Sequence, residues 1–204
     1  MITCGPTWVP IDPMRVISNR SSGEMGHALA QEFRKAGAQV TLLEGPVSHS
    51  LTSNNIVVKK FSFYAELTAL IRQELKKSYD IVIHAAAVSD YRLSKPFGRK
   101  ISSKLPGLNL RLTPTPKIIG MIKRWNQNVF LIGFKLEPAL NEKSITAKTR
   151  DLFKKAHCDL VVANTLSKTS YTAYIIDRKR NILKQEKNRR SIANSLVKVT
   201  EQLL

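Results

Sequence analysis

The chain has 204 residues, a length that fits one domain, and we expect that domain to cover residues 1–204. No apolar run approaches the ~18 residues of a membrane span, and the first residues lack the basic-then-apolar pattern of a secretory signal. These absences argue against a membrane or secreted protein, so we expect a cytoplasmic one. The formal net charge of +18 favours anionic partners, such as nucleic acid or phosphorylated small molecules.

The positive charge is spread along the chain and is densest over residues 178–190. That stretch contains no aromatic side chain on which a base could stack, so a solvated surface explains it better than nucleic-acid binding. Cys4 and Cys158 lie in or beside apolar strands, and we expect both to be buried free thiols.

Apolar periodicity predicts alternating strands and helices along the chain. Strands are predicted at residues 2–4, 39–44, 56–60, 80–88, 109–112, 129–134 and 159–163, followed by an antiparallel pair at 171–176 and 182–184. Helices are predicted at residues 22–37, 63–77, 115–125, 144–155 and 191–204. This order indicates an α/β fold, a Rossmann-like doubly wound and mostly parallel sheet with an antiparallel hairpin at one edge.

Residues 92–107 interrupt this alternation, because they are polar and basic and include prolines and glycines. Structureless segments of this length inside a compact domain are usually functional or disordered. We therefore predict a mobile loop or flap.

The stretch from Arg15 to Gly26 is interpreted as a loop that ends in a helix N-terminus. Ser21 and Ser22 are good N-cap residues, because their hydroxyls can accept hydrogen bonds from the first amides of the helix. Gly23 and Gly26 allow a ligand or a neighbouring strand to approach the backbone closely. A helix start that follows a strand is a potential anion site, because its unpaired amides and its dipole favour negative charge.

Small and polar residues follow four of the predicted strands, at Gly5, Ala85–Asp90, Gly133–Lys135 and Ala163–Thr165. In an open α/β sheet, ligands bind outside the carboxyl ends of the strands, so these residues are expected to surround a phosphorylated or nucleotide ligand. The dinucleotide and Walker glycine patterns are both missing, and no Ser-His-Asp arrangement stands out among the four histidines.

Several blocks of sequence match one known family: Gly5-Pro6-Thr7, Pro10-Ile11-Asp12-Pro13, Arg15, Ile17-Ser18-Asn19, Ser21-Ser22-Gly23, Met25-Gly26, Ala85 to Tyr91, Lys100-Ile101, Gly133-Phe134 and Leu160 to Asn164. Over almost its whole length the chain resembles the phosphopantothenate–cysteine ligases. In most bacteria this ligase is fused to a flavin decarboxylase. Because Met1 opens the first predicted strand, we expect a stand-alone form with a separate decarboxylase partner.

The resemblance implies a ligase of coenzyme A biosynthesis that joins 4′-phosphopantothenate to cysteine, using a nucleoside triphosphate and Mg²⁺. In this family the pantothenate carboxylate attacks the α-phosphate, giving an acyl-nucleotide and pyrophosphate, and the cysteine amine then displaces the nucleotide. Such chemistry needs cations and hydrogen-bond donors for the developing charge and no side-chain nucleophile. The resemblance also implies a homodimer with a shared active site, and Mg²⁺ held mainly through the triphosphate.

By match to the family motifs, Asn19 would hold the acyl-nucleotide, and Arg15 would bind phosphopantothenate in the neighbouring subunit's site. Lys100 would come from the flap to neutralise phosphate charge. Substrate contacts are further expected from Ala86, Ala87 and Asp90. Nucleotide contacts are expected from Gly5, Ser21, Gly23, Gly26, Ala86, Asp90, Lys100, Pro116, Lys117, Ile118, Ile119, Phe134, Lys148, Lys155 and Asn164.

Four departures from the family are present, and the first is that Ser102 and Ser103 stand where bacterial members usually have a second lysine after the Lys-Ile pair. Lys148 and Lys155 stand seven residues apart, where the family has two helix lysines four apart. Lys135-Leu136-Glu137 replaces the bacterial Ala-Ala-Glu, and Lys117 occupies an aspartate position of CTP-using members. We expect CTP, with ATP as the alternative.

Two other functions stay open at this point. One is a non-catalytic Rossmann-like module that binds nucleotides or nucleic acid, suggested by the net charge. The other is an NAD-dependent reductase, against which stand the missing glycine fingerprint and the lack of an acidic residue suited to ribose after the second strand, where Glu44 is the only candidate.

Overall fold

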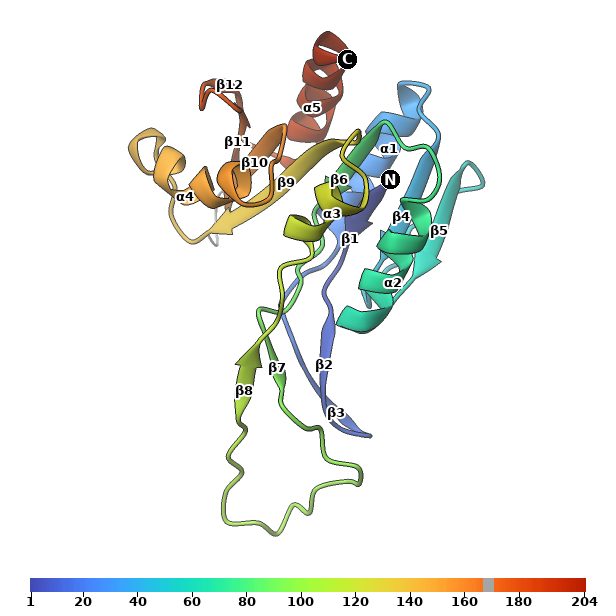
Figure 1. Cartoon of the computed structure of the whole chain (residues 1–204), viewed down its shortest axis with the longest axis vertical. Helices are drawn as coiled ribbons and strands as arrows, with labels where there is room; N and C mark the ends of the chain where they lie inside the picture. The colour runs from blue at the N-terminus through green and yellow to red at the C-terminus, as the bar shows by residue number, and fades with distance from the viewer. Residues whose placement is uncertain (167–170) are drawn as a thin grey trace.

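The computed structural model describes residues 1–166 and 171–204. An eight-stranded sheet with helices on both faces forms the body of the molecule (Figure 1). Its strands are β1 (Ile2–Cys4), β4 (Val40–Glu44), β5 (Ile56–Lys60), β6 (Ile81–His84), β9 (Phe130–Glu137), β10 (Leu160–Leu166), β11 (Tyr171–Asp177) and β12 (Ile182–Glu186). Its helices are α1 (Glu24–Lys35), α2 (Tyr64–Glu74), α3 (Ile119–Trp125), α4 (Glu142–Lys154) and α5 (Arg189–Leu203).

The strand order is β12-β11-β10-β9-β6-β1-β4-β5, with β1 between β6 and β4. Six neighbouring strands run parallel: β5, β4, β1, β6, β9 and β10. At the edge beyond β10, β11 and β12 are antiparallel. After β1 the chain moves outward to β4 and β5, then returns to β6 on the other side of β1. This reversal between β1 and β6 is the topological switch point, where α/β sheets bind ligands. The predicted doubly wound sheet with an antiparallel edge is therefore confirmed.

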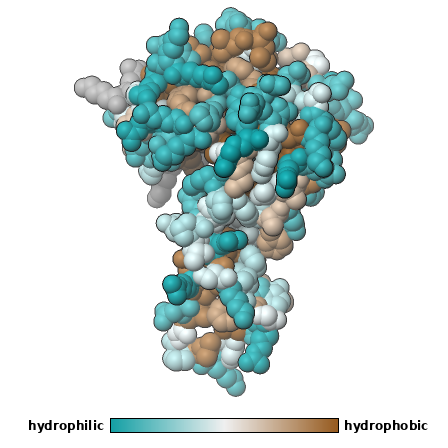
Figure 2. Space-filling view, in the orientation of Figure 1, coloured by the Kyte–Doolittle hydropathy of each residue, from teal (hydrophilic) through white to brown (hydrophobic). Residues whose placement is uncertain are grey.

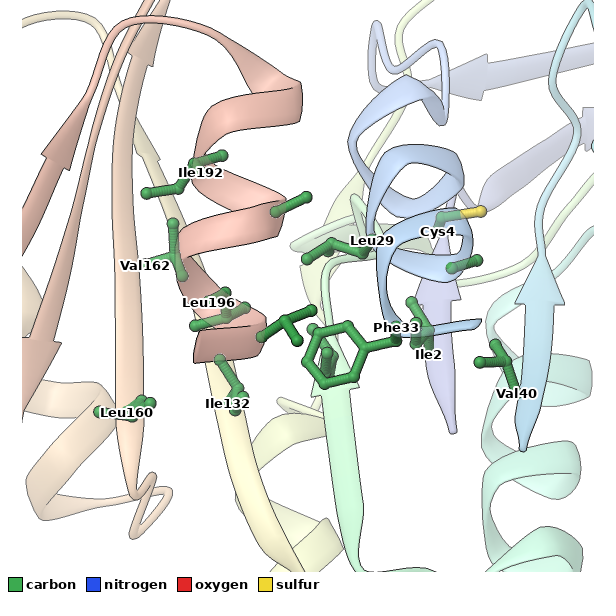
Figure 3. Close-up of a cluster of buried hydrophobic side chains, with 14 of the residues drawn as sticks. Ile2, Cys4, Leu29, Phe33, Val40, Ile132, Leu160, Val162, Ile192 and Leu196 are labelled. Atoms are coloured by element: carbon green, nitrogen blue, oxygen red, sulfur yellow. The ribbon is translucent and has the colours of Figure 1, made fainter. Parts of the chain in front are cut away.

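Helices α1 and α5 cover one face of the sheet, and apolar side chains fill the space between. Figure 3 shows Leu29 and Phe33 of α1 and Leu196 of α5 pointing toward Ile2 and Ile132 of the strands. The other face is covered by α2 and α3, whose buried leucines and isoleucines form a second cluster. Within the described part of the chain, no helix has the length and apolar character needed to cross a membrane.

Two antiparallel strand pairs extend together from the carboxyl edge of the sheet and form an arm (Figure 1). The first pair is β2 (Trp8–Asp12) with β3 (Arg15–Ser18), and the second is β7 (Tyr91–Leu93) with β8 (Leu112–Pro114). We call residues 8–18 and 91–114 the arm. Residues 94–111 within it contain neither helix nor strand.

The arm corrects two expectations from the sequence. The stretch from Arg15 to Ser18 is a strand rather than loop, because its backbone pairs with β2. The strand predicted at 109–112 lies instead at Leu112–Pro114 and pairs with β7, outside the main sheet. Both pairs are short and half exposed, so they leave no continuous apolar run of the kind that marks a buried strand.

The start of α1 differs from the predicted serine cap. Its N-cap residue is Gly23, with φ at +78°, and no side chain caps the helix. The Ser22 hydroxyl accepts only a long 3.5 Å bond from the amide of Glu24. The first amides of α1 are thus free of a side-chain cap, and they point toward the carboxyl edge of the sheet.

Glu44 ties three elements together below the start of α1. Its buried carboxylate contacts His27 of α1 at 2.5 Å and Lys60 at the end of β5. It also accepts hydrogen bonds from the Ser50 hydroxyl and the Leu51 amide in the loop between β4 and β5. Burial alone would raise its pKa, but the hydrogen bonds from Lys60, Ser50, Leu51 and His27 outweigh burial and lower the pKa to about 2. Glu44 therefore has a structural role.

Gly26→Ala tests the contact between α1 and β1. A Cβ at position 26 would lie 2.1 Å from the Cβ of Cys4, so the helix would have to move away from the strand. We expect the free energy of unfolding, measured by urea denaturation, to fall by about 3 kcal/mol or more. Gly120→Ala is the control, because its Cβ would meet only the Lys155 carbonyl oxygen, at 3.9 Å. An equal loss in both variants would contradict the explanation.

Glu44→Gln tests the carboxylate in the cluster. Because the pKa of Glu44 is lowered in the folded protein, its contribution is complete above the unfolded pKa of about 4.5 and is lost as pH falls toward 2. Wild type should exceed the variant by about 3 kcal/mol in free energy of unfolding at pH 7, and this difference should shrink steadily below pH 5. The exposed Glu201, replaced by Gln, is the control. A difference that stays constant down to pH 2 would exclude this role.

Candidate active site

A cavity of about 990 Å³ opens at the carboxyl ends of β1, β6, β9 and β10. It lies between the start of α1, the residues after β6, the residues before α3, and α4. The structure brings nearly all of the sequence-predicted site residues into its lining: Gly5, Asn19, Ser21, Gly23, Gly26, Ala86, Ala87, Asp90, Pro116, Lys117, Ile118, Ile119, Phe134, Lys148, Lys155 and Asn164. Their roles toward a ligand stay predictions.

The glycines at the start of α1 are explained by packing within the protein. Gly5 and Gly23 both have positive φ, and a Cβ on either would meet the side chain of Val47 within 3 Å. Gly26 lies against Cys4 of β1. These contacts draw the helix start onto the strand end, so the unpaired amides of α1 line the cavity.

Asn19 reaches across the switch point from the end of the arm. Its side-chain amide donates hydrogen bonds to the carbonyl oxygens of Ala87 at 3.1 Å and Val88 at 3.3 Å, just beyond β6. The amide of Ala87 donates in turn to the Gly5 carbonyl at 2.9 Å, which continues the parallel pairing of β1 and β6. With its NH₂ group bound to carbonyls, Asn19 presents its side-chain oxygen as the atom left for a ligand.

Asp90 and Lys117 face each other across the mouth of the cavity. Lys117 donates to the Asp90 carboxylate, and both side chains are largely exposed to solvent. The amide of Thr115 also donates to the Asp90 carbonyl oxygen at 2.8 Å, which fixes the segment before α3 beside Asp90. A ligand that used Asp90 as an acceptor would compete with Lys117 for it.

Glu137 links two lysines on the wall formed by β9 and α4. Its carboxylate lies 3.1 Å from the Nζ of Lys135 and 3.0 Å from the Nζ of Lys148. The hydrogen bonds from Lys148 and then Lys135 lower the pKa of Glu137. Lys155 pairs with Asp151 one turn away on α4, at 2.9 Å. Lys148 and Lys155 thus reach the same cavity despite their spacing of seven residues.

Sequence reasoning missed several residues of the lining. Leu136 and Glu137 line the cavity because β9 and β10 extend beyond the predicted strand ends, whereas Lys135 is among the residues expected there. Extending the predicted strand beyond Phe134 could have found them. Two further lining residues are Tyr171 and Arg189, whose guanidinium lies 5.3 Å from the centre of the Tyr171 ring. The sequence carries no local signal for them, because they come from the antiparallel edge of the sheet and from α5.

Arg15 and Lys100 do not line this cavity. Both lie on the arm, where Arg15 pairs with Asp12 at 2.7 Å and Lys100 is exposed on the irregular segment. The segment predicted as a flap is thus part of the arm, and its mobility stays a prediction.

The cavity has no activated nucleophile among the described residues that line it. Burial raises the pKa of the Cys4 thiol to about 12, and burial lowers the pKa of His84 to about 4. Cys4 is therefore a neutral thiol at neutral pH, as predicted for both cysteines, which are buried and free. His84 is neutral and hydrogen-bonded to the hydroxyl of Thr3 at 3.0 Å.

The described residues include one candidate group of metal ligands. One group of Cys, His and carboxylate side chains, comprising Cys4, His27 and Glu44, lies close enough together, within 4.8 Å, to share a cation. The Glu44 carboxylate of this group is already bound by Lys60 and His27. Mg²⁺ prefers oxygen ligands and usually shares them with substrate phosphates, so this group does not suit it.

Comparison with known proteins identifies the family. Over residues 1–204 the sequence matches the DNA/pantothenate metabolism flavoprotein C-terminal domain. It is 45% identical over 168 residues to the coenzyme A biosynthesis bifunctional protein CoaBC of Thermococcus kodakarensis, covering 81% of this chain and 41% of that protein. The chain spans about half the length of the curated relatives it matches.

The solved structures agree with this match. The DNA/pantothenate metabolism flavoprotein from Streptococcus pneumoniae superposes with a TM-score of 0.87 at 26% identity, over 100% of this chain and 98% of that one. A Cab2 mutant in complex with phosphopantothenate-cysteine shares the fold, with a TM-score of 0.73 at 20% identity, over 98% and 85% of the two chains. The chain therefore belongs to the family of DNA/pantothenate metabolism flavoprotein C-terminal domains.

Proposed function

We propose that this chain is a phosphopantothenate–cysteine ligase, which forms an amide between 4′-phosphopantothenate and the amine of cysteine in coenzyme A biosynthesis. The observation that carries the proposal is the cavity at the switch point, which combines a bare helix N-terminus with several lysines and lacks an activated nucleophile among its described residues. Relatives named for coenzyme A biosynthesis and a fold neighbour that holds phosphopantothenate-cysteine support the same reaction.

The reaction has two steps, and both suit this cavity. The pantothenate carboxylate attacks the α-phosphate of the nucleotide, an acyl-phosphate bond forms, and pyrophosphate leaves. The cysteine amine then attacks the acyl carbon, loses a proton, and releases the nucleoside monophosphate. Both steps develop negative charge on oxygens, which amide donors and cations stabilise without any covalent enzyme intermediate.

The phosphates are assigned to the start of α1 and to the lysines of α4. The free amides near Gly23 and the helix dipole favour an anion there. Lys148 and Lys135 are held by Glu137, so a triphosphate can bind them by competing with this carboxylate. Mg²⁺ would be held mainly through the triphosphate, because the carboxylates of Asp90, Glu137 and Asp151 all pair with lysines.

Asn19 is assigned to the acyl intermediate. Its NH₂ group is fixed by the carbonyls of Ala87 and Val88, so its orientation is set before a ligand arrives. The nucleotide base is assigned to the segment 116–119, where Lys117 stands beside Asp90. CTP remains the expected nucleotide, with ATP as the alternative.

A homodimer with shared active sites is the assembly we propose, with Arg15 acting in the partner's site. Figure 2 shows hydrophobic side chains exposed among polar ones on the arm, at the lower end of the molecule. Apolar residues exposed on the arm are Met14, Val16, Tyr91, Phe97, Leu105, Leu108 and Leu112. Exposed apolar groups gathered on one feature mark a protein interface, and Arg15 lies beside them.

The ligase reaction is tested with purified protein, 4′-phosphopantothenate, cysteine, Mg²⁺ and either CTP or ATP. We expect pyrophosphate release that requires 4′-phosphopantothenate, continues over many turnovers only with cysteine, and is faster with CTP. Asn19→Asp should lower turnover by about 10²-fold or more. The substitution replaces the fixed side-chain amide by a carboxylate, whose negative charge would repel the phosphate of the acyl-nucleotide. No pyrophosphate with either nucleotide would remove the proposal, and unchanged turnover in the variant would remove Asn19 from the mechanism.

The dimer is tested with Val16→Glu on the arm and Val57→Glu on β5. Both valines are exposed strand residues, at 41% and 57%, so the two substitutions are matched. Light scattering should give twice 22.9 kDa for wild type and for Val57→Glu, and a monomer for Val16→Glu. A monomeric wild type would contradict the shared site.

A further inference from the structure

Asp12 is a buried carboxylate at the end of β2, in an arm most of whose residues are exposed or half-buried. The residue is 4% exposed, and its side chain is fully covered. Buried carboxylates persist in proteins when both of their oxygens are hydrogen-bonded, and here both are.

The partners of Asp12 come from two separate parts of the chain. One oxygen accepts from the backbone amides of Met14 and Arg15, each at 2.8 Å. The other accepts from the Arg15 guanidinium at 2.7 Å and from the backbone amide of Ile101 at 3.0 Å. The bond from Ile101 is the largest of the influences that hold the pKa of Asp12 below its usual range.

Arg15 completes the arrangement, because the guanidinium nitrogen that binds Asp12 also donates to the Ile101 carbonyl oxygen at 3.2 Å. The amide of Phe97 donates to the Ile11 carbonyl at 2.8 Å, so the segment runs along the end of β2 from Phe97 to Ile101. Lys100 lies between these anchors. The Asp12 carboxylate therefore binds the Arg15 guanidinium and the backbone next to Lys100, and neither Arg15 nor Lys100 lines the cavity of its own chain.

We propose that Asp12 is a positioning residue that holds Arg15 and the Lys100 segment together, so that both cations reach one phosphate site as a unit and from the same subunit. This rests on the proposed function for the identity of that site. If Lys100 instead moved alone into its own cavity, the Ile101 amide would leave Asp12. The buried carboxylate would then lose a hydrogen-bond partner, which disfavours such a movement.

The hydrogen bonds of Asp12 can be tested by proteolysis, without measuring ligase activity. Asp12→Asn keeps the shape but offers only one acceptor oxygen, so it cannot serve both sets of donors. We expect trypsin to cleave after Arg99, Lys100 and Lys104 at least about tenfold faster in the variant, because the segment is released. Ile101→Pro removes the same bond from the other side, because proline has no backbone N–H, and it should speed cleavage after Arg99 and Lys104 to the same degree. Lys100 is not counted in this variant, because trypsin does not cut before proline.

The matched control is Asp177→Asn. Asp177 also accepts with both oxygens, from the amide and side chain of Asn181 at 2.7 and 2.9 Å, but in the turn after β11. Its substitution should leave cleavage of the arm segment and ligase activity unchanged. Wild-type cleavage rates in both Asp12→Asn and Ile101→Pro would overturn the positioning role, whatever the protein's activity.

Kinetics separate positioning from general damage to the fold. In Asp12→Asn we expect the KM for 4′-phosphopantothenate to rise at least about tenfold while the KM for cysteine stays within about twofold. Adding Arg15→Ala to Asp12→Asn should lower kcat/KM little further, because the two residues act together. A loss of kcat alone, or equal rises in both KM values, would overturn the proposal.

Mixed dimers test the shared origin of the two cations. Co-expressed Arg15→Ala and Asn19→Asp chains should regain about a quarter of wild-type activity, because half of the dimers are mixed and each has one intact site. Co-expressed Arg15→Ala and Lys100→Ala chains should regain none, because every site then receives an arm that lacks one cation. Recovery to about a quarter in this second mixture would show that the two cations come from different subunits.

Pyrophosphate release by wild type separates the two proposals. If wild type released none, the ligase function would fail, while the cleavage of Asp12→Asn would still decide whether Asp12 holds the segment. If wild type were active and the second mixture recovered, the ligase function would stand and the positioning unit would fail.

Discussion

The close contact between Gly26 and Cys4 is the constraint on which the site depends. With no side chain at position 26, α1 packs directly on β1, and its first amides reach the carboxyl edge of the sheet. Gly5 and Gly23 accept the neighbouring Val47 in the same way. These glycines, which the sequence alone associates with ligand binding, allow the close packing of α1 on β1. That packing in turn places the first amides of α1 where they can bind an anion.

Electrostatic balance is the second principle of the cavity. Lysines and arginines together outnumber carboxylates in the described lining, yet Lys117, Lys148 and Lys155 each have an acidic partner. In the absence of a ligand such pairs limit the repulsion between cations. An anionic ligand exchanges one partner for another, so its net gain is smaller than the number of lysines suggests.

The sequence predicts the body of the fold well, because its long periodic segments are buried in a regular sheet. It predicts most of the cavity for the same reason: strand ends such as Gly5 and Ala86 converge once the topology is known. The arm is missed, because strands as short and exposed as Tyr91–Leu93 carry no periodic signal. Arg189 is missed because its place depends on α5 packing beside α1, a contact between distant parts of the chain.

The arm differs from the body in how it is stabilised. Val9, Asp12 and Leu93 are its only buried residues, whereas the body has large apolar clusters on both faces of the sheet. Regions with few buried contacts open at a lower free energy than the core and form separate cooperative units. The arm should therefore exchange its amide hydrogens well before the sheet does. One free energy of unfolding therefore describes the body of this protein, and a second, lower opening free energy describes the arm.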